Sequence, residues 1–391
     1  MSPVRPLLSL MLGVLFAALF ALATGGTAHA VEKTFAGSAQ FDYHIVPSPS
    51  DANGRALSFD GFTTEASLKL VVDLTDQLSA NVKVCYGCHG FETDMAYMDF
   101  RVADELAFRA GRINASFGAF NLRHDPGNHR LSDKPLPYDM GRMLRLRDWN
   151  MGVLPSPFPD NGVEVSGTHW FGGKAQLDYA VYGISGFKGA KDGTDLDFVQ
   201  SRSGSAYYVD NNNRPTLGGR LSLTAKLSEV TDLTVGSSFM YGTFDPANKQ
   251  TYAIAGADVS LRIDRTSLRA EYLVRRQTFD DSDPTRFKFA TPATGGDFFS
   301  KHGAYVELEH PLSDRVDGIV RVDGMFREGN VLAGSALSRK SAVGRFTLGT
   351  SILVVRSFRL KGSTELWGFS DEDARGHVRE VSFHVGSVVT F

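Results

Sequence analysis

Residues 381–391 read Val-Ser-Phe-His-Val-Gly-Ser-Val-Val-Thr-Phe and carry the pattern that decides the fold. Apolar side chains alternate with small or polar ones, and in a β-strand such alternation places the two kinds on opposite faces. One face carries Val381, Phe383, Val385, Val389 and Phe391. The other carries Ser382, His384, Gly386 and Thr390. The stretch therefore predicts a strand with an apolar environment on one side and a polar one on the other.

The composition narrows the classes of protein to consider. The chain has 391 residues, of which 42% are hydrophobic and 22% charged. Its mean hydropathy of −0.15 excludes a bundle of apolar transmembrane helices. The formal net charge of −3 lacks the basic excess that nucleic-acid binding needs, so we expect no nucleic acid among its partners.

Residues 1–30 have the features of a secretory signal peptide. Arg5 supplies a basic start, residues 7–22 are an apolar core, and Ala28 and Ala30 are the small residues of a cleavage site. We predict cleavage after Ala30, which leaves 31–391 as the exported chain; an uncleaved N-terminal anchor is the alternative. Beyond residue 30, no window approaches the roughly 18 consecutive apolar residues of a spanning helix.

Strand-like segments alternate with turn-rich ones along the whole exported chain. About sixteen are expected, an even number within the range of bacterial outer-membrane barrels. They are 34–45, 62–74, 77–87, 93–102, 104–112, 162–170, 174–185, 215–227, 230–243, 251–264, 265–277, 301–311, 314–328, 340–355, 356–370 and 376–391.

The connections between these segments are sorted by length. Each even-numbered strand is joined to the next by only a few residues, as at Thr75-Asp76 and Gly172-Gly173, whereas the long connections 46–61, 113–161, 186–214 and 278–300 follow odd-numbered strands. Short turns on one rim and long loops on the other are typical of a membrane barrel. The fold class predicted is all-β: a transmembrane antiparallel meander β-barrel of about sixteen strands.

Charged residues indicate which face of each strand points inward. In 314–328, Val320 and Val322 alternate with Arg321 and Asp323. Because a charge facing lipid at mid-depth costs roughly 2–4 kcal/mol, the charged rows must face the lumen. A barrel of this size leaves an aqueous channel, so these rows are expected to line a wet pore. The alternative is the solvated outer face of a soluble sandwich.

Phe391 fits the same reading, because outer-membrane β-barrels of Gram-negative bacteria characteristically end on an aromatic residue. That residue closes the last strand at the membrane interface and is recognised by the insertion machinery. The expected partners are therefore outer-membrane lipid and the barrel-insertion machinery. The last strand must pair with the first exported one, near Phe35 to Val46, since an open edge is not stable in lipid.

The connection 113–161 is too long to be idle in a compact fold. It carries six Arg or Lys residues and five Asp residues, and 138–149 could form a short helix. Arginines at a narrow neck would favour anions. The candidates for such a pore constriction are Arg123, Arg142, Arg145 and Arg147, with Asp139 and Asp148 as counter-charges. Alternatively, these charges pair with one another and tie the loop to the wall.

The run Phe108-Arg-Ala-Gly-Arg-Ile-Asn-Ala-Ser-Phe-Gly118, which leads into this loop, resembles the phosphate-selective porin O and P family. There a strand ending in Gly-Arg or Gly-Gln, with an aromatic-Gly pair, opens the third loop. The resemblance implies a sixteen-stranded porin in which the third connection on the long-loop side, here 113–161, folds into the lumen as a constriction. It also implies passive diffusion of small hydrophilic, in part anionic, solutes. A homotrimer is one candidate assembly. The family's ladder of arginines is not clearly matched.

The only two cysteines, Cys85 and Cys88, are followed by His89 in the spacing of covalent c-type haem attachment. Three readings stay open: a Cys85–Cys88 disulfide in an oxidising compartment, one c-type haem with His89 as an iron ligand, or another metal site. With haem, the barrel would carry electrons between periplasmic cytochromes and an extracellular partner. Candidate second axial ligands are Met95, His124, His129, Met140 and Met143.

Other functions are less well supported by the residues. A barrel enzyme would need a nucleophile, a base and an acid in one grouping, and none emerges from the order of the chain. A structural or adhesive barrel lacks an obvious passenger or peptidoglycan-binding domain. The sequence therefore favours a diffusion porin, with the haem-bearing electron carrier as the alternative, and no enzymatic activity.

Overall fold

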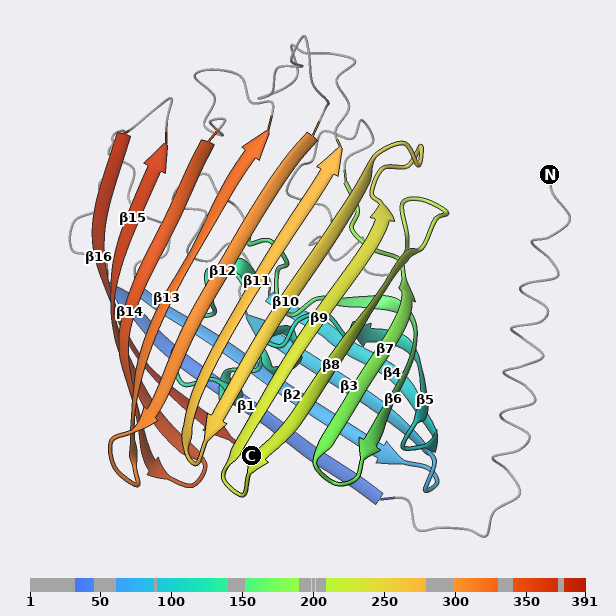
Figure 1. The fold of residues 1–391 in the computed structure, drawn as a ribbon, viewed down its shortest axis with the longest axis horizontal. Coiled ribbons are helices and arrows are strands. Elements are labelled where there is room, and N and C mark those ends of the chain that lie inside the picture. Colours follow the sequence, from blue (N-terminus) through green and yellow to red (C-terminus); the bar gives the residue numbers. More distant parts are fainter. Residues whose placement is uncertain are drawn as a thin grey trace, which may run out of the picture.

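The computed structural model describes residues 32–45, 61–87, 90–139, 152–189, 198, 201, 209–278, 298–329, 340–371 and 376–391. Within these ranges the chain forms sixteen strands that close into one barrel (Figure 1). No helix in the described ranges is long and apolar enough to cross a membrane. The predicted signal peptide, 1–30, lies outside the described residues.

All sixteen predicted strands are present. They are β1 (Glu32–Ile45), β2 (Gly61–Asp73), β3 (Leu78–Gly87), β4 (Gly90–Ala103), β5 (Leu106–Asn114), β6 (Pro159–Phe171), β7 (Ala175–Ile184), β8 (Thr216–Ser228), β9 (Thr231–Thr243), β10 (Thr251–Ile263), β11 (Thr266–Thr278), β12 (Phe298–Pro311), β13 (Val316–Gly329), β14 (Lys340–Val355), β15 (Phe358–Asp371) and β16 (Gly376–Thr390).

Every strand is antiparallel to its two sequence neighbours, and β1 closes the cylinder against β16. In this seam Gln40 lies opposite Val388 and His44 lies opposite His384. Beyond the last strand, the Phe391 amide donates to the Gly37 carbonyl at 3.1 Å, and the Gly37 amide donates to the Phe391 carbonyl at 2.9 Å. The predicted pairing of the first and last strands is confirmed, and no open edge is left at the seam.

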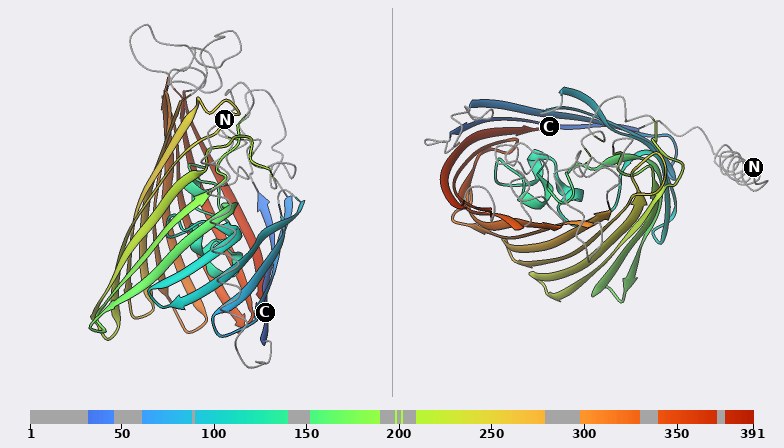
Figure 2. Two further views of the ribbon diagram at one scale, coloured as in Figure 1. Left: turned by 90° about the vertical axis from the view of Figure 1, so that its right-hand side faces the viewer. Right: turned by 90° about the horizontal axis from the view of Figure 1, so that it is seen from above.

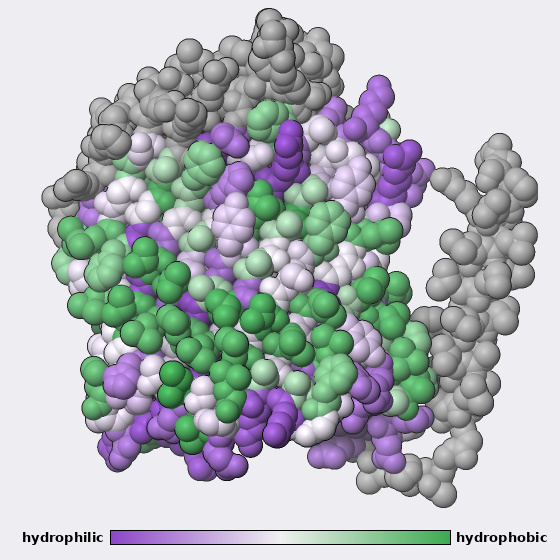
Figure 3. All heavy atoms as spheres, viewed as in Figure 1, coloured by the Kyte–Doolittle hydropathy of each residue, from purple (hydrophilic) through white to green (hydrophobic). Residues whose placement is uncertain are grey.

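The two faces of the wall follow the predicted alternation. Outward side chains such as Val322, Leu348 and Val385 are exposed, and hydrophobic residues form a band across the middle of the outer surface (Figure 3). Inward side chains such as Arg321 and Glu365 are buried. This is the distribution that lipid outside and a polar lumen inside require.

The strand ends that are joined by short connections lie at one rim of the barrel, and the strand ends that precede and follow the long connections lie at the other (Figure 1). The strands differ from the prediction mainly at the long-loop rim, where several begin earlier. Pro159, for example, already pairs with Asn114, although a proline there reads as loop. The strand ladder thus extends past the alternating residues, because its backbone hydrogen bonds do not depend on side-chain polarity.

Candidate functional site: the lumen and its inner loop

The connection between β5 and β6 folds into the barrel (Figure 2). We call residues 115–158 the lumen loop; its described parts are 115–139 and 152–158. It contains three short 3₁₀ turns, η1 (Asn121–Arg123), η2 (Pro126–Asn128) and η3 (Leu136–Tyr138). η3 packs against β12 and β13, and η2 packs against β1 and β16. The predicted insertion of the connection 113–161 into the lumen is confirmed for its described parts.

An apolar cluster fills part of the lumen around this loop. The loop contributes Phe117, Phe120, Leu136, Tyr138, Val153 and Leu154, all of them buried. The wall contributes inward side chains such as Ile254, Leu273, Met325 and Val343. The sequence predicts a wet pore lined by charged rows, but apolar side chains also line part of the lumen. Buried apolar surface holds the loop in place, at roughly 25 cal/mol for each Å² removed from water.

Glu271 of β11 is the polar anchor at the centre of this cluster. Its carboxylate accepts the Ala119 amide at 2.9 Å and the Phe120 amide at 3.2 Å. The Tyr138 hydroxyl also donates to it, as does the Tyr305 hydroxyl at 3.2 Å. One buried carboxylate thus meets four donors, which compensates its loss of water.

Gly118 makes this anchor possible. Its backbone has φ +65°, a conformation that L side chains rarely adopt, and a Cβ there would overlap the Tyr138 hydroxyl and the Glu271 carboxylate. Gly118→Ala is therefore expected to lower the free energy of unfolding by roughly 1–2 kcal/mol through backbone strain and by about 1–3 kcal/mol more through overlap. Denaturant unfolding of the purified barrel in detergent measures both.

Gly173→Ala is the matched control. Gly173 lies in the short β6–β7 turn with φ +71°, and a Cβ there meets nothing within 4 Å. This variant reports the backbone strain alone. Equal losses for the two variants would mean that the Gly118 contact with Tyr138 and Glu271 contributes nothing.

A second anchor is a buried ion-pair cluster between the lumen loop and β13–β15. Loop Asp133 pairs with Arg321 at 2.9 Å and also with Arg345. Arg345 further pairs with Asp323 at 2.5 Å and with Glu365 at 3.2 Å, and its guanidinium donates to the Lys134 carbonyl at 2.9 Å. Two arginines on the wall thus hold the middle of the loop.

A third anchor lies at the barrel seam. Lys361 of β15 donates to the Pro126 carbonyl at 2.8 Å and to the Leu131 carbonyl at 3.1 Å. Gln40 of β1 donates to the Ser132 carbonyl at 2.8 Å. Loop carbonyls in and after η2 therefore accept hydrogen bonds from side chains of β15 and β1, the two strands that flank β16.

A fourth contact joins the loop to Lys83 in the middle of β3. Lys83 pairs with Asp94 at 2.8 Å and with Asp125 of the loop, and its ammonium lies 3.1 Å from His124 Nε2. Burial alone would raise the pKa of Asp125, but His124 and Lys83 favour the carboxylate more strongly, and the net effect lowers that pKa. Asp125 is therefore ionised at neutral pH.

A cavity of about 670 Å³ remains at the short-turn end of the lumen. It lies between β4 and β8, beneath the lumen loop, and both signs of charge line it: Asp99, Arg101, Asp104, Arg109, Asp178 and Arg220. Arg109 pairs with Asp99 at 3.0 Å and with Glu164 at 3.2 Å, and Arg220 pairs with Asp258. The cavity is polar and close to charge-balanced.

Solved structures with the same architecture support this description. An anion-selective porin from Comamonas acidovorans aligns with 93% of this chain and 100% of its own, at 12% identity and a TM-score of 0.55. The outer membrane channel DcaP of Acinetobacter baumannii aligns over 93% and 98%, at 12% identity and a TM-score of 0.54. The chain has a porin fold.

Salmonella typhi OmpF, solved with daunomycin, aligns with this porin fold over 92% of this chain and 97% of its own, at 9% identity and a TM-score of 0.55. No family model matches the chain, and no curated protein does. The likeness is thus one of fold. The resemblance to the phosphate-selective O and P family has no support from these comparisons.

Of the six predicted constriction residues, only two are among the residues that the structure of this porin-fold barrel describes. Arg123 lies in the lumen with its guanidinium 3.6 Å from Glu307 of β12 and over the Phe120 ring. Asp139 is buried at the end of η3. Arg142, Arg145, Arg147 and Asp148, and most of the predicted helix 138–149, lie outside the described residues, so their placement at a constriction stays a prediction.

The cysteine motif is described in part. Cys85 lies at the long-loop end of β3 and forms no disulfide with any residue that the structure describes; its sulfhydryl lies 3.6 Å from Asp94 Oδ2. Cys88 and His89 lie outside the described residues. Of the suggested axial ligands, His124 and His129 are buried and their Nδ1 atoms bond the Asn121 and Leu131 carbonyls. The haem and disulfide readings stay predictions.

The residues that hold the loop were mostly not found from the sequence. Glu271, Lys361 and Arg345 were recognisable only as inward charges of their strands. Each meets the loop at a sequence separation above 100 residues. Alternation shows which way a strand residue points, but not what it meets across the lumen.

Proposed function

We propose that this protein is an outer-membrane channel for passive diffusion of small hydrophilic solutes. The observation that carries the proposal is a closed barrel, apolar outside, whose lumen holds an anchored loop above a polar cavity. An anchored loop fixes the width of the passage, and polar walls admit hydrated solutes. The structural neighbours named as porins and channels agree with this use of the fold.

Planar-bilayer recording tests the proposal directly. The purified barrel is expected to give discrete, ohmic conductance steps, smaller than those of a barrel with an open lumen, because the loop occupies part of the section. Heat-denatured protein at the same detergent concentration is the control. Folded protein without conductance would contradict a diffusion channel.

A preference for anions is the finer part of the proposal. The described cavity is near charge balance, since Arg109 and Arg220 are each paired with acids. Any preference would therefore come from the loop arginines Arg142, Arg145 and Arg147. Under a salt gradient, a reversal potential toward the anion value is expected, and Arg142→Gln/Arg145→Gln/Arg147→Gln should reduce it. A cation-directed potential in the unmodified protein would contradict this part.

A diffusion role needs no catalytic group, and the geometry around His384 does not favour one. Ser382, Glu365 and His384 lie near one another, but the Ser382 hydroxyl donates to Glu365 at 2.8 Å. A nucleophile activated by histidine would instead donate to the imidazole. We propose accordingly that the protein is not an enzyme. Export after cleavage at Ala30, insertion by the barrel-assembly machinery and assembly as a homotrimer belong to the same proposal.

The haem-bearing electron carrier is the second candidate, favoured by the Cys85-x-x-Cys88-His89 spacing and by the position of Cys85 at the long-loop end of β3. Protein produced with a c-type haem maturation system would then show a Soret band that survives acid–acetone extraction. The expected partners would be periplasmic cytochromes. Colourless protein from such cells rules the candidate out, and Cys85→Ser/Cys88→Ser is the matched control for adventitious haem.

A further inference from the structure

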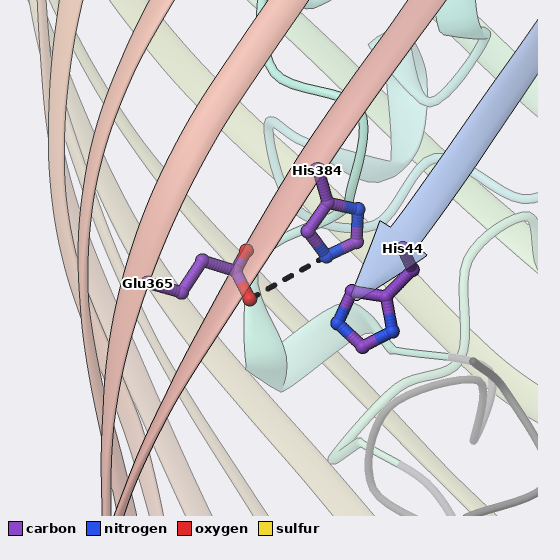
Figure 4. Close-up of side chains that lie close together, drawn as sticks. All are labelled: His44, Glu365 and His384. Atoms are coloured by element: carbon purple, nitrogen blue, oxygen red, sulfur yellow. Dashed lines mark ion pairs between the residues drawn. The ribbon is translucent and has the colours of Figure 1, made fainter. Parts of the chain in front are cut away.

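We propose that His44, Glu365 and His384 form a binding site for one divalent transition-metal ion of the zinc class on the inner wall at the barrel seam (Figure 4). The three side chains come from β1, β15 and β16, which are adjacent strands. The proposal is independent of what passes through the lumen.

Strand register brings the three groups together. His44 lies directly opposite His384 in the β1–β16 ladder, and their ring centroids are 4.2 Å apart. Glu365 lies opposite Ser382 in the β15–β16 ladder, one inward position from His384. One ligand atom from each residue falls within 4.8 Å of the others. The site is thus set by the backbone of the sheet rather than by a loop.

His384 shows the need for a further partner. Its side chain is 1% exposed, and neither ring nitrogen makes a hydrogen bond within the part of the chain that the structure describes. The nearest acid is Glu365, whose Oε2 lies 3.5 Å from His384 Nε2. Buried imidazole nitrogens are normally bonded, so an unbonded pair calls for an explanation. A metal ion bound to Nε2 would provide one of the two missing bonds.

Glu365 is held in place by its own neighbours. Its carboxylate accepts the Trp367 indole N–H at 3.1 Å and the Ser382 hydroxyl at 2.8 Å. Arg345 reaches its other oxygen at 3.2 Å, but Arg345 is shared with Asp133 and Asp323. Both donors reach Oε2, the oxygen nearest to His384, so a bound ion would take the place of one of these hydrogen bonds. Such outer contacts orient metal-binding side chains in known sites.

The donor set selects the class of metal. Two imidazoles and one carboxylate suit Zn²⁺, Ni²⁺, Cu²⁺ or Fe²⁺ rather than Ca²⁺ or Mg²⁺, which prefer oxygen. Tetrahedral bonds of about 2.0–2.1 Å place ligand atoms about 3.3 Å apart. The His384–Glu365 distance of 3.5 Å fits that edge. The His44 ligand atom lies within 4.8 Å of the other two, so it would have to move closer on binding, and the fourth position would take water.

Metal titration of the untagged barrel in detergent tests the site. After treatment with EDTA, the protein should bind one Zn²⁺ per chain by calorimetry, and Co²⁺ should give the visible absorption of a tetrahedral site. His384→Gln and His44→Gln should each weaken binding by at least about tenfold, since loss of an outer contact alone costs 10–100-fold. His310→Gln, an exposed residue of β12, controls for surface histidines and should bind as the unmodified protein does.

A second readout separates binding from folding. Zn²⁺ should raise the unfolding midpoint of the unmodified barrel and of His310→Gln, but not that of the two site variants. Heat-modifiable migration in gels confirms that each variant is folded before titration. Folded protein that binds no Zn²⁺, or that binds it equally after both substitutions, would overturn the proposal and leave an ion pair between His384 and Glu365 as the reading.

Discussion

Replacing Arg345 by glutamine is expected to lower the free energy of unfolding by about 3–5 kcal/mol, the usual cost of breaking a buried ion pair from one side. The substitution leaves Asp133, Asp323 and Glu365 close together without the cation they share. It also removes the bond to the Lys134 carbonyl. Because the lumen loop loses this anchor, channel conductance should rise and become noisy. Denaturant unfolding and bilayer recording measure the two effects.

Arg262→Gln is the matched control for Arg345→Gln. Arg262 also pairs with an aspartate, Asp232, but its side chain is 56% exposed and lies near the short-turn rim, away from the lumen loop. Exposed pairs contribute only about 0–1 kcal/mol. Arg345→Gln with unchanged stability and conductance would show that the ion-pair cluster does not hold the loop.

Phe391→Asp is expected to reduce strongly the amount of folded barrel in the outer membrane, while any inserted barrels conduct normally. The Phe391 ring lies over Gly37, so close that a Cβ there would lie 2.5 Å from the ring. The side chain is 64% exposed on the outer surface of the seam. A carboxylate in its place removes apolar contact at the closing pair and presents charge toward lipid. Membrane fractionation with heat-modifiable gel migration gives the measurement.

Phe391→Tyr keeps an amphipathic ring suited to the membrane interface and should insert at unmodified levels. This control variant shows whether the loss in Phe391→Asp comes from the missing aromatic contact or would follow from any substitution at this position. Normal levels of Phe391→Asp, or equal losses for both variants, would contradict the role assigned to Phe391 in closing the seam.

The wall of the barrel was predictable because lipid imposes a strict rule on each strand. Val320, Arg321, Val322 and Asp323 can satisfy lipid and lumen in only one orientation, and a one-residue slip would place both charges in lipid. Short turns such as Gly172-Gly173 then fix the antiparallel order. Strand ends at the long-loop rim follow no such rule, so β6 begins at Pro159 rather than at the predicted residue 162.

The interior was less predictable, since its contacts join residues far apart in the chain. The charges of the lumen loop drew attention to ion selection, yet Asp133 serves to bind Arg321 and Arg345. Phe117, Phe120 and Leu154 were the overlooked signal, because apolar residues in a long loop indicate that it packs against something. On the wall, the partners of these loop residues are harder to recognise. Leu273 and Met325 are buried and face inward, in rows whose other inward residues are charged, and the pattern of the strand does not tell which loop residue they contact.

The contacts around η2 also affect how the cylinder frays. Lys361 and Gln40 tie β15 and β1, the two neighbours of β16, to the same stretch of the lumen loop. If β16 peels from the seam, both flanking strands stay attached to the loop and remain close enough to receive it again. Separation of the seam should therefore be local and quickly reversed. Global unfolding then also requires release of the loop, so variants that weaken these contacts are expected to shorten the lifetime of the folded barrel.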